Sequence, residues 1–267
     1  MGIIRRIFRF IGSVISVIRT LLGLVVLGFI FIAIGGMFAD DLQPIPEKGA
    51  LYLAPGGFLV DQKTYTDPLE KVLSQGEESE TLVRDIVEAL DAAARDSRIT
   101  HLLLDTDYMA GAGLSKLEEI SSALMRFKES GKPMIAVADN FGQQQYYLAA
   151  HADEIMLNPL GGVMITGFAS YRSYYKEALD KLRVKMHIFR VGDFKSAIEP
   201  YMNNSMSTGV KEERRALIDE LWQFYGSQVE ELRGLPTGAI NDYTNNLHAK
   251  LRSANGDSAA LALEQGL

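Results

Sequence analysis

Hydrophobic and polar positions divide the chain into one long apolar run near its start and many shorter apolar segments after it. Thr20 to Ala39 contains no charged residue and is rich in Leu, Val, Ile and Phe. As a helix, about 20 such residues span roughly 30 Å, which is the thickness of the hydrocarbon layer of a membrane. The run therefore predicts one transmembrane helix over residues 20–39.

Charges on either side of this run predict its orientation. Residues 1–19 carry four arginines and no acidic residue, and Asp40 and Asp41 follow the run at once. Because arginines mark the cytoplasmic side, we expect residues 1–19 in the cytoplasm and the rest of the chain outside it. A cleaved signal peptide is the alternative. An uncleaved anchor is favoured, because the run is longer than a usual signal region and Met37 stands where an A-x-A cleavage pattern at Ala39 needs a small residue.

Beyond a polar linker at residues 40–48, strand-like apolar runs alternate with amphipathic helical patterns. Strands are expected as a hairpin-like pair within Ala50–Val60, and at Ile99–Leu104, Met134–Ala138, Glu154–Leu157, Val163–Ile165 and Met186–Val191. Helices are expected from a cap at Ser79 to Arg95, and at Leu114–Glu129, Gln143–Ala152, Ser173–Leu182 and Val210–Arg233. This alternation predicts an α/β domain over residues 49–267, with a mostly parallel sheet covered by helices.

The composition excludes several classes of function. Hydrophobic residues make up 47% and charged residues 23% of the chain, as in folded rather than disordered proteins. The net charge of −7 argues against a nucleic-acid partner. The chain has no cysteine, which excludes disulfides and thiolate zinc sites, and its four histidines show no metal-ligand spacing, so we expect them to be structural or exposed. No cofactor and no metal is predicted.

The candidate chemistry lies in the stretch from Phe189 to Tyr201. It contains a strand end, a turn at Gly192, then Lys195 beside apolar residues, and finally Pro200, which restrains the chain at the exit. A lysine held against apolar surface can lose its proton, because burial lowers the ordinary lysine pKa of about 10.4 by roughly 3–5 pH units. Lys195 is then a candidate general base. The alternative is a surface lysine whose stem lies over neighbouring aromatic rings.

This stretch resembles the lysine motif in the N-terminal half of the long bacterial signal peptide peptidases, the protease IV family. The resemblance extends, in the same order and spacing, over about residues 45–235. It includes Ser130-Gly131-Lys132-Pro133, Gln145-Tyr146-Tyr147-Leu148-Ala149, Gly167-Phe168-Ala169, Tyr174-Tyr175-Lys176 and Leu179-Asp180-Lys181-Leu182. It implies a Clp-protease/crotonase-like superhelix of strand–strand–helix units, in which Lys195 is the general base of a Ser/Lys dyad.

The serine of that dyad is missing from the expected place. In the catalytic half of the family, Ser-Gly-Gly-Tyr begins the helix after the Met134–Ala138 strand, whereas Gln143 takes the serine's place here. The Ser-Pro-Gly-Gly expected after the Ile99–Leu104 strand is replaced by Tyr-Met-Ala-Gly-Ala-Gly at residues 108–113. The resemblance therefore implies that a second, homologous half supplies the serine. Because the sequence stops in a helix-to-strand passage at residues 259–267, we expect a fragment of a longer protein.

Other polar residues near these positions have alternative interpretations. Ser196 is next to Lys195, but neighbours on an extended segment point to opposite sides, so we expect a hydrogen-bonding neighbour rather than the nucleophile. Glu199 is expected to pair elsewhere, since a carboxylate beside the lysine would raise the lysine pKa. We interpret the acids that end or follow strands as solvated loop residues rather than a metal cluster: Asp105, Asp107 and Asp139.

Together these features predict a membrane-anchored serine peptidase that degrades cleaved signal peptides and other apolar peptides, with this chain supplying the general base and inactive alone. The resemblance implies the bacterial inner membrane, a peptidase domain on the periplasmic side, and a homo-oligomer in contact with the serine-bearing half. The main alternative is a non-catalytic scaffold or interaction protein of the same fold, in which Lys195 is a remnant. An acyl-CoA enzyme is a weaker alternative, because it needs no anchor.

Overall fold

The computed structural model describes residues 2–37, 47–65, 80–189, 191 and 195–267. The chain forms two compact units, Met1–Glu47 and Lys48–Leu267. The described part of the first unit is dominated by one helix, α1 (Gly2–Met37), and the sheets belong to the second. Residues 40–46 of the predicted linker, and the cap predicted at Ser79, lie outside the described ranges.

Helix α1 contains the apolar run noted in the sequence. Its stretch from Val14 to Ala33 has a mean hydropathy of 2.5, and none of it is buried within the chain. A helix satisfies its own backbone hydrogen bonds, which a segment surrounded by lipid must do. The helix is long and apolar enough to cross a membrane, although its most apolar stretch begins before the predicted residues 20–39 and includes Arg19.

The second unit is built on a four-stranded sheet, in the order β1 (Gly49–Leu53), β4 (Ile99–Asp105), β6 (Met134–Ala138) and β8 (Glu154–Leu157). Helix α3 (Val83–Arg95) leads into β4, and α4 (Leu114–Glu129) leads into β6. Parallel neighbours need such crossovers because the chain has to return to the same end of the sheet. The predicted α/β fold is confirmed, and every strand pair in the described ranges is parallel.

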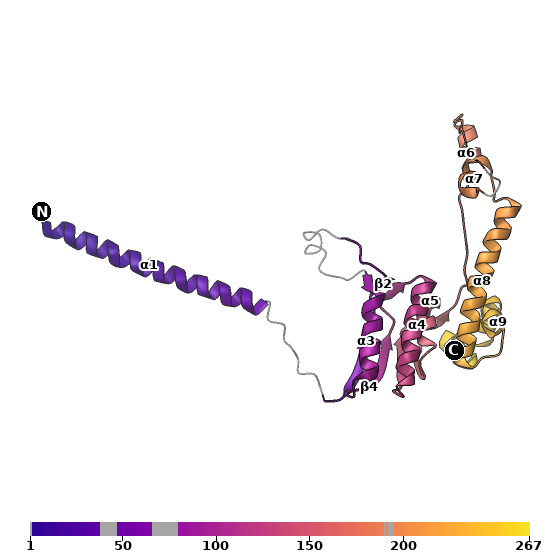
Figure 1. Cartoon of the computed structure of the whole chain (residues 1–267), viewed down its shortest axis with the longest axis horizontal. Helices are drawn as coiled ribbons and strands as arrows, with labels where there is room; N and C mark the ends of the chain where they lie inside the picture. Colours follow the sequence, from indigo (N-terminus) through magenta and orange to yellow (C-terminus); the bar gives the residue numbers. More distant parts are fainter. Residues whose placement is uncertain (1, 38–46, 66–79, 190, 192–194) are drawn as a thin grey trace. The chain divides into compact units, whose positions relative to one another are not determined.

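One face of this sheet packs into the hydrophobic core with α3 and α4, which lie side by side (Figure 1). Leu102 and Leu104 of β4 point into this core, where they meet Leu90 of α3 and Leu124 of α4. Alternate residues of a strand face opposite sides, so only every second residue of β4 and β6 is buried. Full burial of such side chains contributes about 1.5–3 kcal/mol each.

The opposite face of the sheet is only partly covered by the described residues. Its apolar side chains are half-buried or exposed: Tyr52, Leu103, Ile135, Val137 and Met156. Parallel sheets are ordinarily covered on both faces. The cover of helices predicted from the sequence is thus found on one face only within the described ranges.

Two smaller sheets accompany the large one. The first has the order β3 (Glu80–Leu82), β2 (Gly57–Val60) and β5 (Met109–Gly111), and the second pairs β7 (Phe141–Gly142) with β9 (Val163–Met164). The hairpin predicted within residues 50–60 is wrong, because β1 and β2 join different sheets. Gly57, whose φ is 66°, helps to turn the chain between them.

Helix α5 (Gln143–Ala149) lies between β6 and β8 in the chain, and further helices follow the last strand: α8 (Thr208–Arg233), α9 (Ala239–Asn245), α10 (Leu247–Ser253) and α11 (Ser258–Glu264). Only the C-terminal half of α8 contributes buried residues. There, the ring centroid of Tyr225 lies 5.7 Å from that of Tyr147 on α5. The Tyr225 hydroxyl donates to the backbone oxygen of Gln143 at 2.9 Å, so α8 is fastened to the start of α5.

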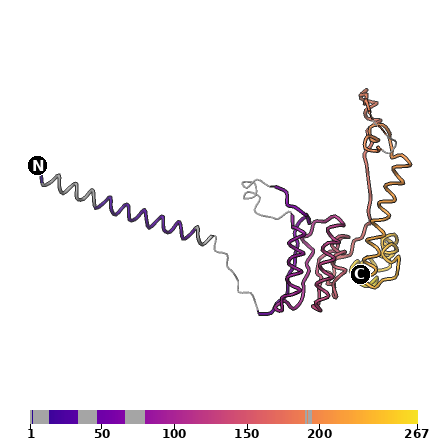
Figure 2. Tube along the Cα trace, in the orientation of Figure 1, coloured from indigo at the N-terminus to yellow at the C-terminus, as the bar shows by residue number. Residues whose placement is uncertain are grey.

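The segment between β9 and α8 differs from the prediction. The chain runs without regular structure to α6 (Lys176–Lys181), which is shorter than predicted, and returns through η1 (Ser196–Ile198) and α7 (Glu199–Met202) to α8 (Figure 2). The strand predicted at 186–191 is not formed by its described residues. Their β-favouring side chains are mostly exposed, and no neighbouring strand in the described ranges supplies the hydrogen bonds that a strand needs.

A polar pair is buried beside the end of α5. Ser121 Oγ lies 2.6 Å from Nε2 of His151, whose Nδ1 lies 3.1 Å from the backbone oxygen of Tyr147. The His151 side chain is buried, and burial lowers its pKa to about 4 because the interior disfavours the charged ring. His151 is therefore structural, as expected, and it gives the domain a pH-dependent stability.

We expect the domain to lose stability as the pH falls from 6.5 towards 4. In this range the unfolded chain binds a proton at His151 and the folded chain does not, so the free energy of unfolding falls by up to roughly 3 kcal/mol. Urea unfolding, followed by the fluorescence of Trp222, should show a smaller pH dependence for His151→Gln than for the parent. The exposed His248 provides the matched control, His248→Gln. The same pH dependence in His151→Gln and the parent would contradict the assignment.

Candidate active site

Lys195 stands at the start of a short helical turn. It directly precedes η1, with φ −93° and ψ 84°, and its side chain is exposed. The turn predicted at Gly192 lies outside the described residues, and Lys195 itself stands at the entry to a 3₁₀ turn. Ser196 belongs to this turn, so the extended geometry assumed for it is wrong. The apolar cover predicted around Lys195 is not supplied by the described residues of the chain.

Residues 172–175 form hydrogen bonds to this turn and to the helix that follows it. Arg172 donates from Nη1 to the backbone oxygen of Ser196 at 3.2 Å, and from Nη2 to that of Ala197 at 2.7 Å. The backbone N–H of Tyr175 donates to the backbone oxygen of Pro200 at 2.7 Å. Two segments more than twenty residues apart in sequence are thus joined immediately after Lys195.

Glu199 follows the turn and is 7% exposed. Its carboxylate accepts hydrogen bonds from the Tyr174 hydroxyl at 3.2 Å, from Asn203 Nδ2 at 3.2 Å and from the backbone N–H of Ser207 at 3.0 Å. The hydrogen bonds from Ser207 hold the pKa of Glu199 below its ordinary value, because they favour the charged carboxylate. The prediction that Glu199 pairs away from Lys195 is confirmed.

Three consecutive glutamines begin α5 and fasten separate loops to it. Gln143 stands where the resemblance places a serine, and its Oε1 accepts the backbone N–H groups of Thr166 at 3.1 Å and Gly167 at 2.7 Å. An amide cannot act as an acyl-transfer nucleophile, so this position holds a loop instead of performing chemistry. Gln145 acts similarly, through hydrogen bonds with Gly142, Thr106 and Met109.

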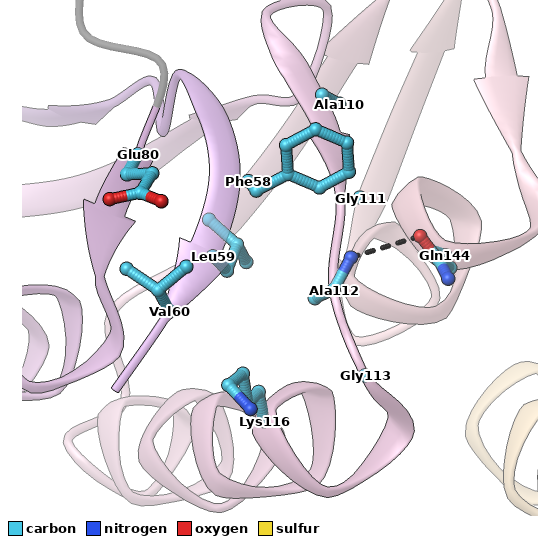
Figure 3. Close-up of a pocket in the computed structure, with 10 residues that line it drawn as sticks. All are labelled: Phe58, Leu59, Val60, Glu80, Ala110, Gly111, Ala112, Gly113, Lys116 and Gln144. Carbon is cyan, nitrogen blue, oxygen red and sulfur yellow. Dashed lines mark hydrogen bonds between the residues drawn. The ribbon is translucent and has the colours of Figure 1, made fainter. Parts of the chain in front are cut away.

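Gln144 closes one side of a groove of about 690 Å³ (Figure 3). Its Oε1 accepts the backbone N–H of Ala112 at 3.0 Å, in the loop that replaces the expected Ser-Pro-Gly-Gly. The opposite wall is formed by Phe58, Leu59 and Val60 of β2. A backbone N–H that would otherwise face the groove is therefore occupied by a side chain of the same chain.

The structure does not bring Lys195 and Gln143 together. The hydrogen bonds described for residues 196–203 are made among themselves and with residues 172–175 and 207. Figure 1 shows α6 and α7 near the N-terminal end of α8, whose buried residues lie in its other half. Lys195 and the groove beside Gln144 are thus separate features of this chain.

The acidic residues after the strands stabilise their own loops. Asp105 accepts the backbone N–H of Asp107 at 3.0 Å, and Asp107 accepts that of Asp139 at 2.7 Å. Asp139 accepts a side-chain N–H of Asn158 at 2.8 Å. Across the described ranges, no group of three or more His, Cys, Asp or Glu residues is arranged to hold a metal ion. The hydrogen bonds of these three carboxylates support their interpretation as loop residues.

Comparison with known proteins decides the family. Residues 126–267, which include α5, the Lys195 turn and all later helices, match Peptidase family S49. The chain belongs to this family. The resemblance to signal peptide peptidases inferred from the sequence is thereby confirmed.

Curated S49-type relatives extend well beyond this chain. "Protease 4" of Haemophilus influenzae is 38% identical over 274 residues, which cover 98% of this chain and 44% of that protein. "Protease 4" of Salmonella typhi is 38% identical over 226 residues, which cover 82% of this chain and 37% of that protein. The chain spans less than half the length of these relatives.

Solved structures with a similar arrangement have low identity to this chain. A probable enoyl-CoA hydratase from Mycobacterium smegmatis is 18% identical, with 67% of this chain and 78% of that chain covered and a TM-score of 0.27. A probable enoyl-CoA hydratase from Mycobacterium thermoresistibile is 16% identical, with 67% and 80% covered and a TM-score of 0.28. The strand order and the family match carry the fold assignment, and these likenesses add no argument to it.

Sequence interpretation missed Arg172 and Gln144. A glutamine run at the start of a predicted helix is a signal for side chains that reach back to backbone groups, since glutamine at the third helical position often does so. No comparable signal marks Arg172, because its partners lie more than twenty residues further along the chain.

We expect Gly111 to be required beside Gln144. Its φ is 156°, and a Cβ there would lie 2.7 Å from Gln144 Oε1, which is held by Ala112. Gly111→Ala should therefore lower the free energy of unfolding by about 1–3 kcal/mol. Adding Gln144→Ala should reduce this loss, because the oxygen that meets the new methyl group is removed.

Gly113 provides the matched control in the same loop, because it has φ −69° and no atom within 4 Å of an added Cβ. Gly113→Ala should change the free energy of unfolding by less than about 0.5 kcal/mol. Urea denaturation of the parent and the three variants measures these changes. An equal loss in Gly111→Ala and Gly113→Ala would contradict the described contact.

Proposed function

We propose that this chain is the general-base half of a membrane-anchored serine peptidase that degrades cleaved signal peptides and other apolar peptides. Membership of family S49 supports peptidase chemistry. The observation that carries the proposal is that the chain has a candidate base but no candidate nucleophile at the position where the resemblance places one. Lys195 is exposed on a hydrogen-bonded turn, while α5 begins with Gln143, which has no nucleophilic hydroxyl.

In the proposed reaction, Lys195 accepts the proton of a serine hydroxyl as the serine oxygen attacks the scissile carbonyl. The protonated lysine then gives this proton to the departing amine, which leaves an acyl-enzyme that water hydrolyses. The serine comes from a second, homologous half of the peptidase, because the corresponding position here is Gln143. The hydrogen-bond donors for the oxyanion belong to that half too, since the loop before Gly113 binds Gln144 instead.

The surroundings of Lys195 support contact with such a partner. Large apolar side chains in the segment that precedes it are strongly exposed: Tyr171 at 95%, Leu182 at 73%, Phe189 at 96% and Val191 at 84%. Extended exposed apolar surface marks interaction sites in soluble domains. We propose that the serine-bearing half covers these side chains in a homo-oligomer, and that this cover removes water from Lys195.

Helix α1 is proposed as the anchor of the peptidase in the bacterial inner membrane. Its apolar stretch matches the thickness of a bilayer, and the arginines before it favour a cytoplasmic N-terminus. The second unit then lies on the periplasmic side. The anchor would hold the site close to the membrane, where apolar peptides remain after secretion.

A non-catalytic interaction protein is the second candidate, and one observation favours it. Gln144 satisfies a backbone N–H at the groove, and Gln143 satisfies two more in the loop at Thr166 and Gly167, so these donors are not free for a substrate carbonyl. The described lining of the groove includes no serine, threonine or cysteine that could act as a nucleophile. The two candidates differ in whether Lys195 is needed for peptide cleavage.

We expect Lys195→Ala to reduce peptide cleavage by at least about 10²–10⁴-fold, the usual contribution of a general base. The protein should be purified from its own host as the cell makes it, with any copurifying partner, and assayed for cleavage of a quenched apolar peptide. Because Lys195 is exposed, the substitution should leave the free energy of unfolding nearly unchanged.

Lys181→Ala is the matched control, because Lys181 is another exposed lysine of the same segment, which pairs with Glu177 at the surface of α6. It should retain full activity. Cleavage by Lys195→Ala at the parent rate would remove Lys195 from the mechanism and favour the interaction protein.

The anchor makes a separate prediction. The parent protein should remain in the membrane pellet after an alkaline wash, and a variant lacking residues 2–37 should be soluble. Leu24→Lys with Val25→Lys should weaken membrane insertion, because each lysine at the centre of a membrane helix costs about 2.5–3.5 kcal/mol. Release of the parent protein by alkali would contradict the proposed anchor.

A further inference from the structure

We propose that Arg172 is a positioning residue for Lys195, and that its guanidinium sets the geometry in which the lysine acts. This inference rests on the proposed function of Lys195 as the general base. It adds a residue for which neither the family match nor the related proteins assign a role. Its basis is the two-pronged contact between Arg172 and the turn that begins directly after Lys195.

The contact fixes two successive peptide groups. Arg172 Nη1 lies 3.2 Å from the backbone oxygen of Ser196, and Nη2 lies 2.7 Å from that of Ala197. The Ser196 oxygen also accepts the backbone N–H of Glu199, which closes the 3₁₀ turn. The first of these peptide groups joins Ser196 to Ala197, one residue after Lys195, so the contact fixes the backbone that immediately follows the lysine and limits where its side chain can point.

Arginine suits this role better than lysine does. Its planar guanidinium carries several N–H donors in a fixed fork, so one side chain can bind two carbonyl oxygens at a set angle. A lysine ammonium is a point charge on a flexible stem and does not impose that angle. Hydrogen bonds from a charged donor are also about twice as strong as neutral ones.

The segment that carries Arg172 is itself held against the turn. The N–H of Tyr175 binds the backbone oxygen of Pro200 at 2.7 Å, and the rings of Tyr175 and Tyr201 stack with centroids 5.9 Å apart. The Tyr174 hydroxyl donates to the buried carboxylate of Glu199 at 3.2 Å. The segment that carries Arg172 is therefore held in place by other contacts. Loss of the Arg172 side chain should loosen the start of η1, while residues 174–175 remain bound to residues 199–201.

This arrangement compensates for the exposure of Lys195. Its side chain has no dense packing to hold it, and the described residues on its N-terminal side form no strand. The described hydrogen bonds nearest to it hold the residues that follow it, because Arg172 and Tyr175 donate to the backbone oxygens of residues 196, 197 and 200. A catalytic group that moves by about 1 Å can lose 10²-fold in rate, so a support of this kind acts on catalysis directly.

Steady-state kinetics of peptide cleavage test the inference. The protein is purified from its own host, together with any partner that copurifies. Arg172→Ala should lower kcat by about 10- to 100-fold while KM stays within about twofold, because base geometry and not substrate binding is disturbed. Arg172→Lys should be intermediate. Added methylguanidine should restore part of the kcat of Arg172→Ala, by occupying the space between the two carbonyl oxygens. Lys181→Ala on α6 is the matched control and should behave as the parent.

The double variant separates positioning from a general structural effect. If Arg172 acts only through Lys195, then Arg172→Ala should cause no further loss in a Lys195→Ala background. The same fold loss in both backgrounds, or a parent kcat in Arg172→Ala, would overturn the inference. Parent activity in Lys195→Ala would overturn the proposed function together with the inference, whereas an inactive Lys195→Ala beside a fully active Arg172→Ala would overturn the inference alone.

Discussion

Burial of one face of the parallel sheet beneath α3 and α4 is the constraint on which the domain depends. Leu102 and Leu104 can leave water only if the helices that connect the strands return over the same face. That packing aligns the carboxyl ends of β4 and β6, and the loops that follow them reach α5. The glutamines at the start of α5 can bind these loops because the sheet has already brought them together.

In the glutamine cluster at the start of α5, which consists of Gln143, Gln144 and Gln145, the side chains satisfy backbone groups of neighbouring loops. Loops near a core contain N–H groups that require partners, and water or a ligand often supplies them. Here the side-chain oxygens of Gln143 and Gln144 do so. The cluster stabilises the same loops that would have to bind a substrate carbonyl in a catalytic site. These loops are thus held by hydrogen bonds within the chain.

The Lys195 segment is stabilised by a different kind of interaction. Little of it is buried, and its order comes from hydrogen bonds between residues 172–175 and 196–207, with Glu199 at their centre. Such bonds fix local geometry but bury little apolar surface. Because the segment is held by hydrogen bonds and not by packing, its aromatic and aliphatic side chains are exposed. The described residues leave these side chains mostly exposed, and they cover the second face of the large sheet only in part.

The local pattern of the sequence determined the elements that form within one continuous stretch. The helix at Leu114–Glu129 and the strand at Met134–Ala138 have the predicted bounds, because hydrophobic periodicity and a Gly-Lys-Pro stop are local signals. Pairing between distant strands needed the tertiary structure, which separated β1 from β2 and left the described residues among 186–191 without a strand. The lysine was identifiable from its motif. Its support by Arg172 was not, because that contact exists only after the chain has folded back on itself.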